Sequence, residues 1–171
     1  MIVREEAPRD HDAIEALILT AFDGHPQHAP GARPTEHLIV RALRASERLT
    51  LSLVADDQGM IVGHLCLSPV LIDGEATAWF GLGPVAVAPA CHRKGIGARL
   101  IREGLGRMQE QGAAGVVVLG EPEYYGRFGF SRHPGLWLAQ VPEDAFLALP
   151  LGDRGSSMPT GEVTYDPAFL S

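Results

Sequence analysis

The chain has 171 residues, of which 46% are apolar and 20% are charged. This length and composition predict one compact domain over residues 1–171 and exclude long disordered stretches. The 14 Lys and Arg residues stand against 21 Asp and Glu residues, which gives a net charge of −7. Such a balance excludes a general nucleic-acid binder, because phosphate contacts along a polymer need a basic face. A local basic pocket for one small anion remains compatible with it.

The sequence also lacks the signals of membrane and disulfide-rich proteins. No stretch approaches the roughly 18 consecutive apolar residues of a membrane helix, and residues 1–6 are not an apolar signal segment. We therefore expect a cytoplasmic protein that binds neither a membrane nor nucleic acid. Cys66 and Cys91 are too few for a disulfide framework, and a reducing compartment leaves both as thiols.

The first part of the chain predicts one strand and two helices. Residues 2–5 are a strand candidate, and a helix follows from Asp12, which has the capping-box spacing with Glu15. This helix ends near residues 23–24, and a loop rich in Gly, Pro and His occupies residues 24–34. A second helix begins at Thr35 and places four apolar side chains on one face, namely Leu38, Ile39, Ala42 and Leu43.

The middle of the chain is rich in strands. Residues 49–55, 60–72 and 77–87 have strand patterns and are joined by short turns, so we expect an antiparallel meander. A helix over 98–111 and an apolar strand over 116–119 follow. Because a helical crossover precedes it, the strand 116–119 is predicted to pair in parallel with a neighbour.

The last part of the chain predicts smaller elements. A short helix is expected over 121–128 and a strand over 136–141, and the tail from residue 142 is rich in Pro and Gly with an edge strand over 162–165. The order of elements indicates an α+β fold with antiparallel strands first and one strand–helix–strand crossover after them. An apolar tail with an edge strand is able to pair between two copies of the chain, which leaves a homodimer open.

The histidines do not indicate a metal site. His25 and His28 have an HxxH spacing in the loop 24–34, but a metal would need a third ligand and a rigid frame. We interpret them as exposed loop histidines and expect no metal. His64 lies in the strand 60–72 and is interpreted as a hydrogen-bonded structural histidine.

Residues 85–98 combine a strand end, a short loop and the start of a helix. The first N–H groups of a helix lack internal partners and carry partial positive charge, so they form a site for an anion. Gly95 and Gly97 have no Cβ atoms to hold a phosphate away from the backbone, and Arg93 and Lys94 add positive charge. The sequence predicts a phosphate site here; the alternative is an ordinary strand-to-helix loop whose cations are only solvated. The GxGxxA pattern over 81–86 opens no helix and is interpreted as accidental.

Two motifs carry a resemblance to a known family. The strand 85–87 followed by Pro89 and by His-Arg-Lys-Gly-Ile-Gly over 92–97 resembles the acetyl-CoA-binding motif of the GNAT superfamily of N-acetyltransferases. The second marker is Tyr-Tyr-Gly-Arg-Phe-Gly-Phe over 124–130, which with the closing segment 162–169 is similar to the YhbS-like subgroup. The resemblance covers residues 1–141 and leaves 142–171 as a C-terminal extension of a single N-acetyltransferase domain.

The resemblance implies a fold and a cosubstrate site. The implied fold is α+β, with a mixed, mostly antiparallel central sheet that has a V-shaped splay between two parallel strands and is flanked by helices. Acetyl-CoA is the implied cosubstrate, with pantetheine along the first strand of the motif, pyrophosphate on the loop, and one strand N–H polarising the thioester carbonyl. The implied binding residues are Val85, Ala86, Val87, His92, Arg93, Lys94, Gly95, Ile96, Gly97, Ala98 and Tyr124.

The resemblance also implies catalytic roles. Tyr125 matches the tyrosine that protonates the leaving thiolate in this family, and its alternative is a packing aromatic at the sheet edge. Glu121 is the nearest candidate base, acting through water, and its alternative is a carboxylate that complements a helix N-terminus. The sequence departs from the family pattern by having His92 at the first motif position and no carboxylate on the strand 77–87.

The sequence therefore predicts an acetyl-CoA-dependent N-acetyltransferase that acts by direct attack on a small-molecule or peptide amine. The alternative is a non-catalytic acyl-CoA-binding sensor or structural module of the same fold. Transfer of a longer acyl group also remains open.

Overall fold

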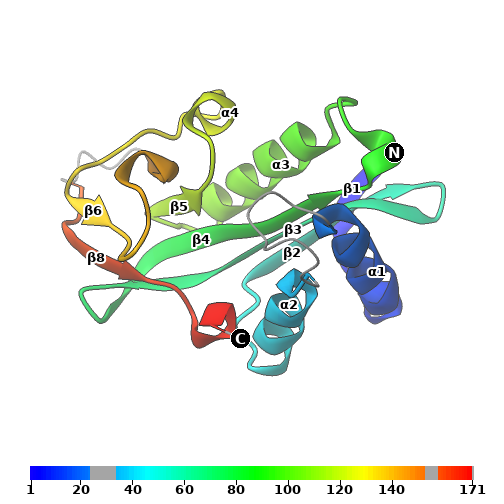
Figure 1. The fold of residues 1–171 in the computed structure, drawn as a ribbon, viewed down its shortest axis with the longest axis horizontal. Helices are drawn as coiled ribbons and strands as arrows, with labels where there is room; N and C mark the ends of the chain where they lie inside the picture. The colour runs from blue at the N-terminus through cyan, green and yellow to red at the C-terminus, as the bar shows by residue number, and fades with distance from the viewer. Residues whose placement is uncertain (24–33, 153–157, 171) are drawn as a thin grey trace.

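The computed structural model describes residues 1–23, 34–152 and 158–170. Within these ranges one mixed sheet has the strand order β1-β2-β3-β4-β5-β7, with β8 beside the far end of β3 and β6 beside β8 (Figure 1). The strands are β1 (Ile2–Glu5), β2 (Leu51–Asp57), β3 (Met60–Ile72), β4 (Glu75–Val87), β5 (Gly115–Leu119), β6 (Leu136–Trp137), β7 (Phe146–Pro150) and β8 (Gly161–Thr164).

Helices cover both faces of this sheet. They are α1 (His11–Phe22), α2 (Glu36–Ala45), α3 (Ile96–Glu110) and α4 (Pro122–Gly126), with short 3₁₀ turns at Pro8–Asp10, Pro89–Cys91, Glu143–Ala145 and Pro167–Leu170. The long helix α3 packs Leu100 and Ile101 against Leu65 of β3 on one face, while α1 and α2 pack against the other (Figure 1). The apolar faces of the helices thus bury side chains against both faces of the sheet, and a third cluster forms where the C-terminal strands join it.

The pairing of the central strands confirms the predicted fold. Strands β2, β3 and β4 form the expected antiparallel meander, and β5 pairs with β4 in parallel after the α3 crossover. Parallel pairing runs from Trp79–Gly115 to Leu82–Val118 and extends no further along β4. Beyond that point β4 stays with β3 alone, so the two parallel strands separate as expected.

The C-terminal segment differs from its prediction. The expected strand over 136–141 is reduced to β6, and the unpredicted strand β7 pairs antiparallel with β5 along its whole length. Phe146, Leu147 and Ala148 are buried there, so their apolar run is a core strand of the kind that cannot be distinguished from a buried helix segment by periodicity alone. Strand β8 lies close to the predicted 162–165.

The start of α1 also differs. The capping box at Asp12 and Glu15 is wrong, because α1 begins at His11 and its N-cap residue is Asp10. The Asp10 carboxylate accepts a hydrogen bond from the Ala7 N–H at 2.7 Å and binds the Arg4 guanidinium at 2.8 Å. These bonds close the preceding 3₁₀ turn, which the spacing rule does not describe. α2 begins at Glu36, one residue after the predicted Thr35, which is its N-cap residue, and its fully buried side chains are Val40 and Leu43.

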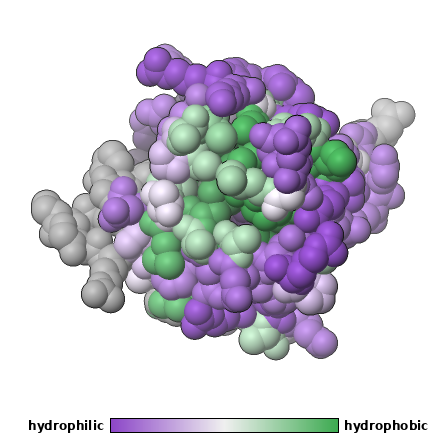
Figure 2. Space-filling model, turned by 90° about the vertical axis from the view of Figure 1, so that its right-hand side faces the viewer, coloured by the Kyte–Doolittle hydropathy of each residue, from purple (hydrophilic) through white to green (hydrophobic). Residues whose placement is uncertain are grey.

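One end of the molecule carries an apolar surface. Figure 2 views the side that lies to the right in Figure 1 and shows apolar residues gathered at its centre within a polar rim. A hollow of about 650 Å³ lies between α1 and the β2–β3 hairpin, with Leu17, Met60 and Ile61 among its lining residues.

Candidate active site

The site begins where β4 leaves β5. Between Leu65 and Leu67 the β3–β4 register shifts, so that Gly83 and Pro84 form a bulge on β4. The Ala88 N–H donates to the Val62 carbonyl of β3 at 2.9 Å. Because main-chain groups alternate along an antiparallel strand, Ala86 also faces β3, while Val85 and Val87 direct their N–H and C=O groups toward the gap. The bulge and the lost pairing therefore expose a strand edge at this point.

The loop that follows is built around left-handed backbone conformations. Arg93 has a φ of 67° and Gly95, the N-cap residue of α3, a φ of 78°. The first helical bond in α3 runs from the Arg99 N–H to the Gly95 carbonyl at 3.0 Å. The N–H groups of residues 96–98 precede that bond and have no partner within the helix. They form the positive end of a 15-residue helix, where an anion is stabilised.

Two of the predicted loop residues lie differently from the rest. The His92 N–H is used within the loop, since it donates to the Pro89 carbonyl at 3.3 Å. Its ring Nε2 lies 3.2 Å from the Val87 carbonyl, so the ring donates to the strand end. Lys94 is exposed and does not line the adjoining cavity. Arg93 and Gly95 do line it.

The exposed strand edge and the helix N-terminus share a cavity of about 730 Å³, which we call the cofactor cavity. It brings together the predicted residues Val85, Ala86, Val87, His92, Arg93, Gly95, Ile96, Gly97, Ala98, Tyr124 and Tyr125, and adds Ala21, Phe22, Cys91 and Arg127. The predicted phosphate loop and the second motif therefore line one space.

Two tyrosines from α4 form part of this wall. The Tyr124 hydroxyl lies 3.1 Å from where a Cβ atom on Gly97 would stand, so a side chain at 97 would crowd it. Tyr125 packs edge-on against Tyr124, with ring centroids 5.0 Å apart, and against Phe130 at 5.8 Å. Burial, with a smaller contribution from Tyr124, raises the pKa of Tyr125 to about 12. Its hydroxyl is therefore a proton donor throughout the neutral range.

A second and larger cavity of about 1030 Å³ adjoins the first, and we call it the acceptor cavity. The two share Phe22, Val85 and Tyr125 as lining residues. Glu121 lines the acceptor cavity only, and its main-chain carbonyl accepts the Tyr125 N–H at 3.0 Å. The carboxylate is exposed at the N-cap position of α4 and makes no capping bond there.

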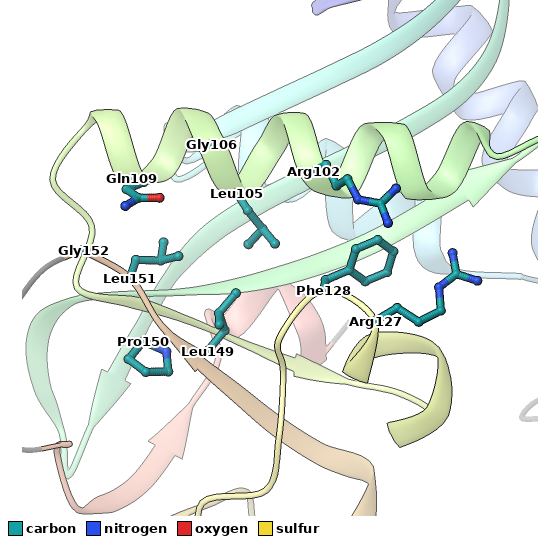
Figure 3. Close-up of a pocket in the computed structure, with 10 residues that line it drawn as sticks. All are labelled: Arg102, Leu105, Gly106, Gln109, Arg127, Phe128, Leu149, Pro150, Leu151 and Gly152. Carbon is teal, nitrogen blue, oxygen red and sulfur yellow. The ribbon is translucent and has the colours of Figure 1, made fainter.

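A third hollow of about 560 Å³ continues from the cofactor cavity at Arg127, which lines both (Figure 3). Figure 3 shows Arg102 of α3 and Arg127 on two sides of the Phe128 ring. Their guanidinium carbons lie 5.0 and 5.4 Å from the ring centroid, which are cation–π distances. This hollow combines positive charge with an aromatic surface.

Sequence reasoning missed several of these residues. Arg127 stands inside the second motif, so its place in the motif was an available signal. Phe22 and Tyr165 carry no local signal, because α1 and the tail reach the site only through the tertiary fold. His25 and His28 lie outside the described residues, and among the described ones no group of three or more His, Cys, Asp or Glu is arranged to hold a metal ion.

His64 is structural, as expected. It is fully buried, and its Nε2 lies 2.8 Å from the Ser52 hydroxyl, which in turn bonds to the Glu6 carboxylate. Burial lowers the pKa of His64 to about 4. Burial alone would raise the pKa of Glu6, but hydrogen bonds from Arg44 and Ser52 outweigh it and lower that pKa. The buried imidazole is therefore neutral beside an ionised carboxylate.

The chain belongs to the GNAT family of acetyltransferases, whose acetyltransferase (GNAT) domain model matches residues 3–132. A GNAT family acetyltransferase from Brucella melitensis, solved in complex with acetyl-CoA, is 42% identical and superposes with a TM-score of 0.84 over 98% of this chain and 97% of that one. YhbS from Escherichia coli, solved in complex with CoA, is 35% identical with a TM-score of 0.89 over 99% and 92%.

A comparison of sequences agrees with this. YhbS of Escherichia coli strain K12, an N-acetyltransferase that is itself uncharacterized, is 36% identical over 179 aligned positions, which cover 99% of this chain and 98% of that protein. Acetyl-CoA is the cosubstrate of the family's domain. Among the helices that the structure describes, none has the length and apolar character needed to cross a membrane.

Proposed function

We propose that the chain is an acetyl-CoA-dependent N-acetyltransferase in which an amine attacks the thioester directly. The observation that carries this proposal is the junction of two cavities at Val85 and Tyr125. A protein that only senses acyl-CoA needs the first cavity. The acceptor cavity opening onto the same two residues supplies a second substrate with a route to the reacting carbon, which favours transfer over sensing.

Main-chain groups make most of the contacts with acetyl-CoA. Val85 offers its N–H and C=O groups and Val87 its N–H to the amides of pantetheine, which would add to the sheet edge as a further strand does, while the Val87 carbonyl accepts from the His92 ring. The N–H groups of residues 96–98 face the pyrophosphate. Arg93 adds charge near the loop, and Arg127 with Arg102 adds charge beside an aromatic ring, where the nucleotide end fits.

Val85 and Tyr125 have separate roles in the reaction. Pro84 has no N–H, so Val85 is the first donor on the β4 edge beyond the bulge, and its N–H stabilises the oxyanion that forms when the amine nitrogen bonds to the thioester carbon. The C–S bond then breaks, and the Tyr125 hydroxyl protonates the departing thiolate. The proton of the attacking amine passes through water to Glu121, which lines the acceptor side of the junction.

Steady-state turnover and direct binding together test the proposal. Acetyl-CoA is titrated calorimetrically, and CoA release is followed with a panel of primary amines. We expect binding and turnover with at least one amine, and a Tyr125→Phe variant that binds acetyl-CoA normally but has kcat lowered about a hundredfold. Tight binding without turnover on any amine would instead favour the sensor.

Glu121 has its own test. Glu121→Gln removes the base but keeps the size of the side chain, so we expect kcat/KM for the amine to fall about tenfold at neutral pH and to recover at alkaline pH, where the amine arrives deprotonated. A fall that is equal at all pH values would assign Glu121 to structure.

A further inference from the structure

We propose that the acceptor is a short diamine-like dication, with one amine that reacts at Tyr125 and a second positive charge held by carboxylates of the C-terminal segment. This inference rests on the proposed function, because it takes the larger cavity as the acceptor's. It names the chemistry of the substrate, which neither the fold nor the relatives specify.

Negative charge surrounds the acceptor cavity. Its lining includes Glu36 of α2, Glu121 before α4, Glu162 of β8 and Asp166 after β8. Among the lining residues that the structure describes there is no Lys, Arg or His. Four acidic residues from three parts of the chain line one space, so the field within it favours a ligand with more than one positive charge.

Arg48 forms a weak ion pair with Asp166. Arg48 reaches Asp166 with its Nε 3.8 Å from Oδ2, and its side chain is 58% exposed. An ion pair of that length and exposure contributes little and is screened by salt. Asp166 also accepts the Ala168 N–H at 2.9 Å through Oδ1, which fixes the carboxylate at the cavity wall.

The buried hydroxyl of Tyr165 is an independent sign of a ligand. The hydroxyl is shielded from solvent and has no hydrogen-bond partner among residues 1–23, 34–152 and 158–170, although its residue lines the acceptor cavity. The Tyr165 ring packs against β4, since a Cβ on Gly81 would lie 3.0 Å from its Cε2 atom. An unpaired buried polar group costs free energy. An ammonium group in the cavity would donate to this oxygen and remove that cost.

The two ends of the cavity differ in chemistry. Tyr125 and Val85 also line the cofactor cavity, whereas Glu162 and Asp166 do not. The reacting amine therefore belongs at the first pair and the second charge at the other. Apolar side chains such as Leu138 and Phe169 line the space as well, and a methylene segment joining two amines suits them.

Three probes with the same six-carbon chain test this, namely 1,6-diaminohexane, hexylamine and 6-aminohexanoate. Their far ends are cationic, neutral and anionic. Binding to the CoA-loaded protein is measured by calorimetry at low salt, without turnover. We expect the diamine to bind about tenfold more tightly than hexylamine and the amino acid to bind weakest. Equal or tighter binding of hexylamine, or binding by none of the three, would overturn the inference.

Isosteric variants locate the charge. Glu162→Gln and Asp166→Asn, alone and together, should reduce the preference for the diamine toward parity and leave hexylamine binding unchanged. Glu110→Gln removes the same charge from α3, away from the acceptor-cavity lining, and should leave the preference intact. Should the double variant fold poorly, Glu162→Gln alone decides, because that side chain is exposed.

Tyr165→Phe separates a ligand role from a structural one. Because the hydroxyl has no partner in the described part of the chain, its removal should leave the melting temperature equal or higher while diamine affinity falls about fivefold. Unchanged affinity would remove Tyr165 from the site. If the wild-type protein acetylates none of the amines, the proposed function is refuted. If it acetylates amines but binds the three probes in another order, only this inference is refuted.

Discussion

The Tyr125 ring lies directly over the main chain of Gly120, so closely that a Cβ on Gly120 would stand 2.3 Å from Cε2 and 2.8 Å from Cδ2 of the ring. The absent side chain therefore sets where the phenol can sit. In Gly120→Ala the ring must move, which should lower the free energy of unfolding by about 1–3 kcal/mol. It should also lower kcat, because the hydroxyl leaves the junction. Thermal melts and steady-state kinetics measure both effects.

Gly126→Ala is the matched control for that variant. Gly126 lies in the same short segment, at the end of α4, and a Cβ there would meet nothing within 4 Å. We expect wild-type kcat and an equal or slightly higher melting temperature. Equal damage in both variants would mean that the segment tolerates no substitution and that the ring contact is irrelevant.

Much of the cofactor side could be predicted because its signals are local. A strand end, two glycines and a helix start lie within residues 85–98, and main-chain geometry then dictates the anion site. The meander and the parallel crossover were equally readable, since alternation and helix periodicity are properties of contiguous residues. The structure confirms the meander and the crossover and corrects element ends by about two residues in several cases, as at the start of α3.

The acceptor side could not be predicted in this way. Its walls combine Phe22 of α1, Glu121 before α4 and Tyr165 of the tail, which meet only after the sheet has formed. Strand β7 was missed for a related reason, because Phe146–Pro150 is identified as a strand by its partner β5 and not by its own pattern. The role of the His92 ring likewise follows from a contact with Val87 that spacing does not encode.

Alkaline pH should leave the acid function of Tyr125 intact. Its raised pKa of about 12 keeps the phenol protonated well above the ordinary pKa of a tyrosine. We therefore expect kcat to stay level up to about pH 10.5 and to show no basic limb near pH 10. A wild-type profile compared with Tyr125→Phe measures this. A limb near pH 10 that disappears in the variant would show that the phenol ionises earlier than its burial implies.

A comparison of Gly95 with Gly74 distinguishes an effect on acetyl-CoA binding from an effect on stability. Gly95 and Gly74 have φ values of 78° and 77°, and a Cβ on either would meet nothing within 4 Å. Changing each to Ala should therefore cost a similar amount, about 1 kcal/mol of folding free energy. Only Gly95→Ala should also raise the KM for acetyl-CoA several-fold, because Gly95 sets the start of α3 while Gly74 turns a distant hairpin. Equal KM values would place the diphosphate elsewhere.

Acid should destabilise the fold through His64. Because its folded pKa of about 4 lies below the ordinary 6.5, the unfolded chain binds the proton more readily. The free energy of unfolding should thus fall as the pH drops from 6.5 to about 4, by roughly 3 kcal/mol in total from this residue. Denaturant unfolding across that range measures the slope. His64→Gln keeps a polar partner for Ser52 but does not titrate, so its slope should be shallower. The carboxyl pKa values of Asp10 and Glu6 are also lowered, but these groups affect stability mainly below about pH 4.5, so the slope between about pH 5 and 6.5 reports on His64. An identical slope in wild type and His64→Gln would contradict the assignment.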